Sequence, residues 1–267
     1  AGFIDTVLIG RVGEVELGAT GLGASVFLFT TIAAMGICMG IDPVASQAFG
    51  ADKPERAREA LWQGLYQALA LALPVTFLYW AVGRSMEFFG VVPEVAQGSL
   101  DYVLGRLPAV LPFLLMTALR GYLQAARVTQ AIVVSSIASN VFNFVADWIF
   151  IYGDAGLEKL GLPALGIEPM GVFGVGLASS MAAFVQLGIM SLGLRAAAAP
   201  DGSEVSRAIS WPLQREMFWL GLPVGFQFLA EVGVFAAVQV IMGGLGTRAV
   251  AAHQVALMLA SLTFSVC

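Results

Sequence analysis

Residues 139–153, SNVFNFVADWIFIYG, place two amides and a carboxylate in an otherwise apolar stretch. Asn140, Asn143 and Asp147 are spaced i, i+3 and i+7, so in a helix they share one face. An amide oxygen beside a carboxylate supplies two hard oxygen ligands, which suit Na⁺ or an exchangeable proton. A stripe of this kind can also hold helices together by hydrogen bonds. The carboxylate favours chemistry over that structural role, because a buried charge is costly in a bilayer.

Two further carboxylates interrupt apolar stretches. Asp5 lies in GFIDTVLIG, where it either is a second carboxylate within the membrane or reaches water from a helix end. Glu231 lies eight residues after Pro223 with no Lys or Arg near it, so we expect a functional role for it. Other polar residues are expected to line a cavity. These are Asn140, Gln63, Tyr66, Gln67 and Gln227.

The amino-acid composition indicates whether this chain lies in water or in a lipid bilayer. Of its 267 residues 58% are hydrophobic and 12% are charged, and the mean hydropathy is +0.85. Soluble domains carry about 25% charged residues, so we predict an all-α polytopic membrane protein, with the lipid bilayer as its main partner. No basic run indicates nucleic acid. Two cysteines and one histidine give no disulfide framework and no metal-binding spacing, so we expect no cofactor other than a coupling ion.

Eight apolar stretches approach the roughly 20 residues that a membrane span needs. They cover residues 1–10, 19–41, 57–82, 99–119, 128–152, 171–194, 213–243 and 249–267. The first and last are incomplete, so we expect a fragment of a longer chain. We predict an amino-terminal six-helix lobe at 1–195, a cytoplasmic linker at 196–212 and the start of a second lobe at 213–267.

Orientation follows from the loops that carry Lys and Arg. The side predicted to be cytoplasmic carries Lys53, Arg56, Arg58, Arg120, Arg127, Arg195, Arg207 and Arg215. The opposite side carries Arg11, Arg84, Arg106, Lys159 and Arg248. The helix that contains Asp147 therefore runs outward.

A weak internal repeat supports two equivalent lobes. A shift of 233 residues aligns Gly10 with Gly243 and Gly13 with Gly246, six spans apart and in the same orientation. Motifs typical of hydrolases and nucleotide-binding proteins, such as HExxH, GxSxG and the P-loop, are missing from the sequence. We therefore expect a protein that is not an enzyme, in which an ion gradient drives any uphill transport.

Several segments, taken in order, resemble the multidrug and toxic compound extrusion (MATE) transporters. They are FIDTVLIGRVGEVELGATGLG, VASQAFGADKPERAREALWQG, ALRGYLQAARVTQ, SNVFNFVADWIFIYG, GLPVGFQFLAEVGVFAA and GGLGTRAVAAHQVAL. The resemblance implies a MATE-like fold of twelve helices in two six-helix lobes. It also implies a monomeric antiporter of the bacterial inner membrane, which exports drug-like, often cationic, compounds in exchange for Na⁺ or H⁺.

The resemblance also implies roles for individual residues. The coupling ion would bind at Asp5, Asn143 and Asp147, with a hydroxyl from Ser179 where the family commonly has Thr. In one branch of the family, a glutamate that matches Glu231 serves a cation site in the second lobe.

Two alternatives remain open at this stage. A lipid-linked oligosaccharide flippase of the same superfamily would need basic residues for a pyrophosphate, and Arg106 is the one residue that favours it. A channel or a helical scaffold without transport predicts passive flux or none.

Overall fold

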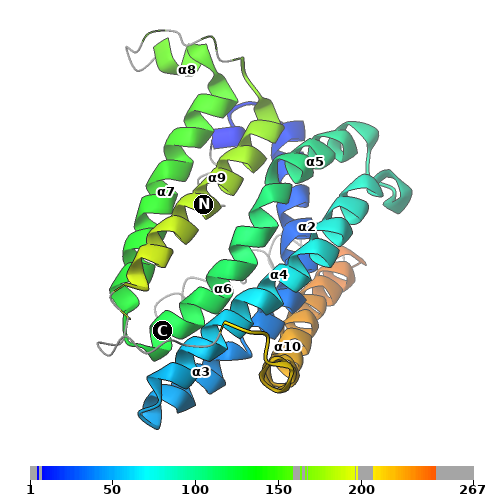
Figure 1. Ribbon diagram of the computed structural model, residues 1–267. Helices are drawn as coiled ribbons and strands as arrows, with labels where there is room; N and C mark the ends of the chain where they lie inside the picture. Colours follow the sequence, from blue (N-terminus) through cyan, green and yellow to red (C-terminus); the bar gives the residue numbers. More distant parts are fainter. Residues whose placement is uncertain are drawn as a thin grey trace. The chain divides into compact units, whose positions relative to one another are not determined.

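The computed structural model describes residues 5, 8–158, 163, 166, 168–195, 197 and 207–244. The chain forms two compact units, Ala1–Gly225 and Phe226–Cys267. Within the described ranges every regular element is a helix (Figure 1). The longer helices are α2 (Glu14–Cys38), α3 (Ile41–Gly50), α4 (Pro54–Arg84), α5 (Pro93–Arg106), α6 (Val110–Ala125), α7 (Thr129–Tyr152), α9 (Gly171–Gly193) and α10 (Trp211–Gly244). Short turns of helix are η1 (Glu87–Phe89), η2 (Leu107–Ala109) and α8 (Asp154–Glu158).

Six helical segments of the described chain are long and apolar enough to cross a membrane. They are Glu14–Gly50, Pro54–Arg84, Pro93–Ala125, Thr129–Tyr152, Gly171–Gly193 and Trp211–Val234. They coincide with the six complete spans predicted from the sequence, and they confirm an all-α, multi-pass membrane protein. The predicted span at 249–267 and most of the one at 1–10 lie outside the described residues. The predicted linker at 196–212 stays a prediction.

Each helix of the first unit packs against a defined set of neighbouring helices. Helix α7 packs along α9, α9 along α5, and α5 along α2, while α4 packs against α6, α3 and α2 (Figure 1). Leu8 and Ile9 pack in one apolar cluster with Ile151 of α7 and Val172 of α9. Tyr152 at the end of α7 also holds Leu8, because its hydroxyl donates a hydrogen bond to the Leu8 carbonyl at 3.1 Å.

Glycines let α5 and α9 approach closely. A Cβ atom on Gly105 would collide with the carbonyl oxygen of Phe173, and one on Gly176 would collide with that of Tyr102. The Ser180 hydroxyl reinforces the contact by donating a hydrogen bond to the Gly105 carbonyl at 2.7 Å. Small residues at such crossings are typical of helices that pack in lipid.

The fourth predicted span, 99–119, is broken in the middle. Pro108 lies in η2, between the end of α5 and the start of α6, because its ring removes a backbone donor that a continuous helix would use. Arg106 is the last residue of α5, well inside the segment Pro93–Ala125. Arg106 was predicted to lie near the start of this span and was counted with the side opposite the cytoplasm. In the structure it lies within the bundle.

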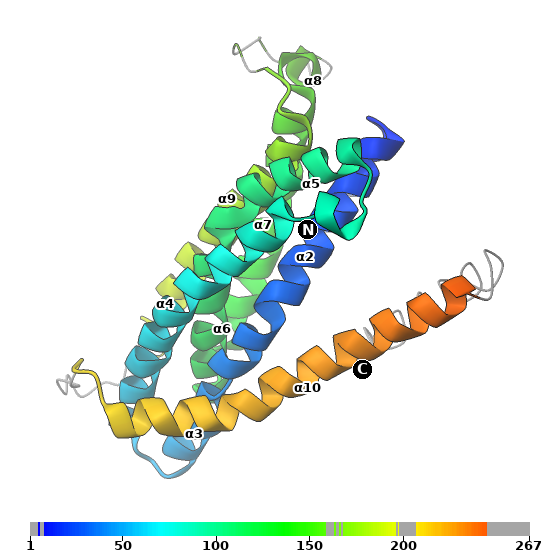
Figure 2. The ribbon, with the colours of Figure 1, turned by 90° about the vertical axis from the view of Figure 1, so that its right-hand side faces the viewer.

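The start of α10 crosses the junction of α2 and α3, as Figure 2 shows. A Cβ atom on Gly40 would meet the carbonyl oxygen of Met217, and one on Gly221 would meet that of Ile37. Backbone therefore packs directly on backbone at this crossing.

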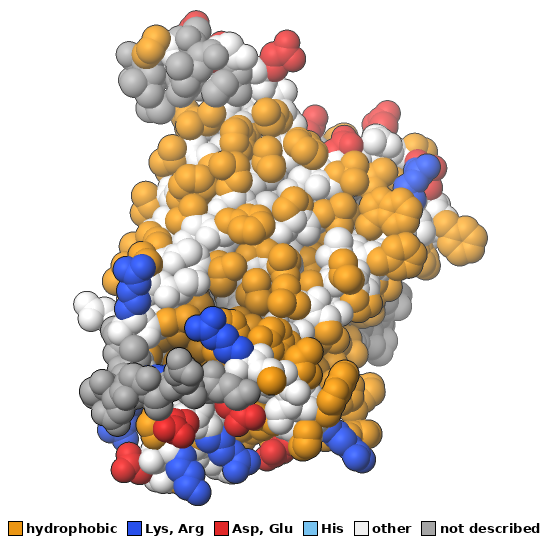
Figure 3. Space-filling view, viewed as in Figure 1, with side chains coloured by type: hydrophobic (Ala, Val, Ile, Leu, Met, Phe, Trp, Pro, Cys, Tyr) orange, Lys and Arg blue, Asp and Glu red, His pale blue; other side chains and the backbone are white. Residues whose placement is uncertain are grey.

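Lys and Arg side chains concentrate at one end of the first unit (Figure 3). In Figure 3 hydrophobic side chains cover the middle of the visible face, and most visible Lys and Arg side chains gather at the end that carries α3. Because consecutive spans run in opposite directions, several connections that carry Lys or Arg lie at this end. Lys53 precedes α4, Arg127 lies between α6 and α7, and Arg195 follows α9. This distribution agrees with the predicted orientation.

Candidate functional site

A buried polar cluster lies where α7 and α9 meet Asp5. Asn143 and Asp147 are one turn apart on α7 and are 0% exposed, while Asp5 and Ser179 are 3% and 6% exposed. The Ser179 hydroxyl donates a hydrogen bond to Oδ2 of Asp5 at 3.2 Å. Asp147 interacts electrostatically with Asp5. The structure therefore brings together residues from three separate parts of the sequence.

Most polar atoms of this cluster have no partner within the described part of the chain. These atoms are Oδ1 of Asp5, both side-chain polar atoms of Asn143 and both carboxylate oxygens of Asp147. Buried polar groups in proteins are almost always hydrogen-bonded, since leaving one unpaired costs about 1–3 kcal/mol. Five such atoms in one place mark a site with capacity for a ligand.

The oxygens of the cluster suit a small cation. Two carboxylates that lie close together cannot both remain charged without a proton or a cation between them. Asp5, Asp147 and the amide oxygen of Asn143 offer hard oxygen ligands of the kind that bind Na⁺, and the same carboxylates can hold a proton. Among the described residues no group of three or more His, Cys, Asp and Glu side chains forms a metal site.

An arginine lies beside the cluster. The Arg106 guanidinium lies 4.4 Å from the centre of the Phe27 ring, and its Nη1 donates a hydrogen bond to the Tyr102 hydroxyl at 2.8 Å. It interacts electrostatically with Asp5 and Asp147. Its positive charge offsets part of the negative charge of the two carboxylates. The cluster therefore needs less additional positive charge to reach neutrality.

Sequence reasoning did not include Arg106 or Tyr102 in this site. The only signal was an arginine within an apolar span, four residues after a tyrosine. A half-buried carboxylate, Asp42 in the first turn of α3, was also missed. Its Oδ1 is buried without a hydrogen-bond partner among the described residues, and Arg120 interacts with it electrostatically.

The predicted cavity-lining residues have different surroundings. The Asn140 amide donates a hydrogen bond to the Ser136 carbonyl of its own helix at 2.8 Å. Gln63 is fully buried and bonds to the segment that leads into α10. Tyr66 and Gln67 line a pocket on another side of the bundle. Glu231 and Gln227 belong to the second unit, on α10, and both side chains are exposed.

We expect Ser179→Ala to weaken the binding of a small cation at the cluster about fivefold, because Asp5 loses the hydroxyl that orients it and one hydrogen bond contributes about 1 kcal/mol. Ser179→Thr keeps the hydroxyl and should restore the affinity. The measurement is equilibrium binding of radioactive Na⁺ at several pH values, which also follows competition by protons. Ser191→Ala on the same helix is the matched control, because that hydroxyl bonds to the Leu187 carbonyl. Equal affinities in both alanine variants would contradict the role of Ser179.

Comparison with known proteins identifies the family to which the chain belongs. A family model described as MatE matches residues 1–149. The multidrug resistance protein NorM of Aliivibrio fischeri is 33% identical over 273 residues, covering 99% of this chain and 56% of that protein. NorM of Vibrio cholerae is 30% identical over 266 residues, covering 98% and 56%. The chain spans about half the length of these curated relatives.

Solved structures share the fold at low sequence identity. A MATE crystal structure in the bent conformation has a TM-score of 0.81 at 19% identity, covering 97% of this chain and 56% of that one. The eukaryotic MATE transporter AtDTX14 has a TM-score of 0.74 at 21% identity, covering 90% and 51%. A MOP superfamily transporter from Pyrococcus furiosus, described as having a binding pocket of reverse polarity that suggests a different function, has a TM-score of 0.74 at 22% identity, covering 98% and 56%.

Proposed function

Because the chain belongs to the MatE family, we propose that it forms part of a secondary antiporter that exports drug-like organic compounds from the cell. The named relatives are multidrug resistance proteins, and the described chain holds six helices that can span a membrane. The complete transporter would lie in the inner membrane and would exchange its substrate for Na⁺ or H⁺. One observation supports the antiport step: five buried polar atoms of Asp5, Asn143 and Asp147 have no partner among the described residues.

In this proposal the cluster alternates between two states of charge. With a proton or Na⁺ bound, the carboxylates of Asp5 and Asp147 are neutralised and α7 and α9 pack closely around them. When the ion leaves, the repulsion between the carboxylates favours a different packing of the segment around Asp5 against α7. An ion shifts a conformational equilibrium only by its difference in affinity for the two states. The cluster supplies that difference. In the ion-bound state the negative charge of Asp5 and Asp147 is compensated, whereas in the ion-free state the two carboxylates repel each other.

The direct test is efflux of a fluorescent cationic dye from cells that express the complete transporter. Efflux is measured with and without external Na⁺, and with and without a protonophore. We expect efflux to stop under one of these treatments, which also identifies the coupling ion. Dye movement that continues under both treatments would contradict antiport and would favour a channel.

The alternative is a flippase for a lipid-linked oligosaccharide of the same superfamily. The observation in its favour is Arg106, a cation inside the bundle that could attract a pyrophosphate. Its guanidinium instead contacts the Phe27 ring and the Tyr102 hydroxyl and compensates two carboxylates. We therefore prefer drug export.

A further inference from the structure

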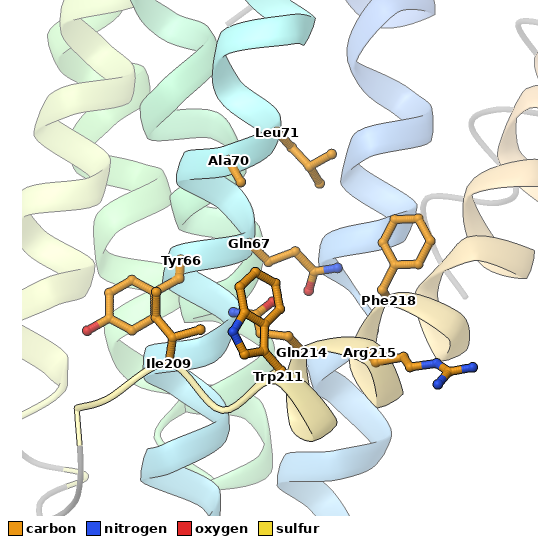
Figure 4. A pocket seen from close by; sticks show the side chains of 9 residues that line it. All are labelled: Tyr66, Gln67, Ala70, Leu71, Ile209, Trp211, Gln214, Arg215 and Phe218. Atoms are coloured by element: carbon orange, nitrogen blue, oxygen red, sulfur yellow. The ribbon is translucent and has the colours of Figure 1, made fainter.

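A second site candidate is a pocket of about 430 Å³ at the Lys- and Arg-rich end of the first unit. Figure 4 shows the side chains that line it, which come from α4, from Ile209 just before α10 and from the first turns of α10. The lining residues are Tyr66, Gln67, Ala70, Leu71, Ile209, Trp211, Gln214, Arg215 and Phe218. Pockets that bind drug-sized molecules have volumes of about 300–1,000 Å³ and are lined by apolar and aromatic groups with a few polar ones.

Hydrogen bonds fix the walls of this pocket. The Tyr66 hydroxyl donates to the Arg207 carbonyl at 2.8 Å, and Nε2 of Gln214 donates to the Gln63 carbonyl at 2.7 Å. The Gln63 side chain completes the junction, because its Nε2 donates to the Ala208 carbonyl at 2.8 Å. Helix α4 is thus attached directly to the start of α10, so the pocket is a built feature of the fold.

Gln67 differs from these neighbours. Its side chain is 5% exposed, yet neither Nε2 nor Oε1 has a hydrogen-bond partner among the described residues. In Figure 4 the amide extends from α4 toward the space between Trp211 and Phe218. A buried amide that keeps both a donor and an acceptor free is costly unless a ligand uses them.

We propose that this pocket binds small, planar aromatic molecules that carry a hydroxyl or amide group at one end and an acidic group at the other. The aromatic body would lie against Tyr66, Trp211 and Phe218, and the hydroxyl or amide would pair with Gln67. The acidic group would face Arg215, which forms no ion pair in the described part of the chain. A membrane phospholipid fits less well, because its acyl chains would leave the deeply buried amide unpaired. The site is separate from the buried carboxylates, so it does not rest on the proposed coupling role.

The test uses 6-hydroxy-2-naphthoate, with equilibrium dialysis against the complete transporter in nanodiscs of zwitterionic lipid. We expect saturable binding that Gln67→Leu weakens about fivefold, the effect of one lost hydrogen bond. The same variant should bind 2-naphthoate, which lacks the hydroxyl, as the parent does. Arg215→Gln should weaken the binding of both compounds. Gln67→Leu is expected to fold normally, because it removes a buried polar group that has no partner.

Matched controls separate this site from other effects. Gln97→Leu and Arg84→Gln change an exposed amide and an exposed guanidinium elsewhere and should leave naphthoate binding unchanged. Asp147→Asn should also bind the naphthoate normally, so a failure of coupling and a failure of this site are distinguishable. Unchanged binding of 6-hydroxy-2-naphthoate in Gln67→Leu, or no saturable binding in the parent, would overturn the proposal. Displacement of the probe by phosphatidylglycerol, with lipid retained by the parent but not by Gln67→Leu, would instead identify a lipid site.

Discussion

Asp147→Asn is expected to reduce dye efflux against a gradient to the level of cells without the transporter. The substitution keeps the shape of the side chain but removes the charge that a proton or Na⁺ would neutralise. Without that charge, ion binding no longer distinguishes the two conformations, and the gradient has no means of driving export. The measurement is efflux of a fluorescent cationic dye, normalised to the amount of transporter in the membrane.

The variant should still insert and fold, because an amide is less costly than a carboxylate at a buried position. Membrane levels and the melting temperature of the purified protein check this expectation. Asp101→Asn is the matched control, since that carboxylate accepts a hydrogen bond from the exposed Gln97 amide. Parental efflux in Asp147→Asn would remove Asp147 from the coupling mechanism.

Gly176→Val is expected to have a large effect on stability. A side chain at this position collides with the carbonyl oxygen of Tyr102 and approaches the Arg106 nitrogen at 3.0 Å. These are backbone atoms, so a change of rotamer cannot relieve the contact, and α9 must move away from α5. Overpacking costs about 1–3 kcal/mol in cores that can adjust and more where they cannot. We expect a large fall in the yield and melting temperature of the purified transporter.

The control for this variant lies on the same helix. A Cβ atom on Gly188 meets no heavy atom within 4 Å. Gly188→Val should therefore keep the yield and melting temperature of the parent. If the two valine variants were equally stable, the close packing of α5 on α9 would be incorrect.

The features that were predictable from the sequence are those that depend on local spacing. Asn143 and Asp147 share a face because they are one helical turn apart, and apolar length alone located the six complete spans. Asp5 was recognised because a carboxylate is rare in an apolar stretch. Ser179 came from family resemblance, and the structure places its hydroxyl 3.2 Å from the Asp5 carboxylate.

The features that sequence reasoning missed depend on contacts between distant segments. Arg106 joins the cluster only because α5 ends before Pro108 and lies against α9 through two glycines. Gln63 and Gln67 looked equivalent as polar residues on one span. In the structure Gln63 is used to attach the start of α10, whereas Gln67 keeps its hydrogen-bonding groups free. Such a difference is decided by a segment about 145 residues away and has no local signature.

The most direct test of the central claim measures the ion that the cluster releases. The complete transporter, purified in the Glu231→Gln background to silence the other candidate carboxylate, is titrated with a fluorescent cationic substrate. Proton release is followed with a pH indicator, and displacement of radioactive Na⁺ is followed in parallel. We predict that substrate binding releases one of these ions and that Asp147→Asn abolishes the release while substrate still binds. Equal release in the parent and in Asp147→Asn would contradict the assignment of the buried cluster as the coupling site.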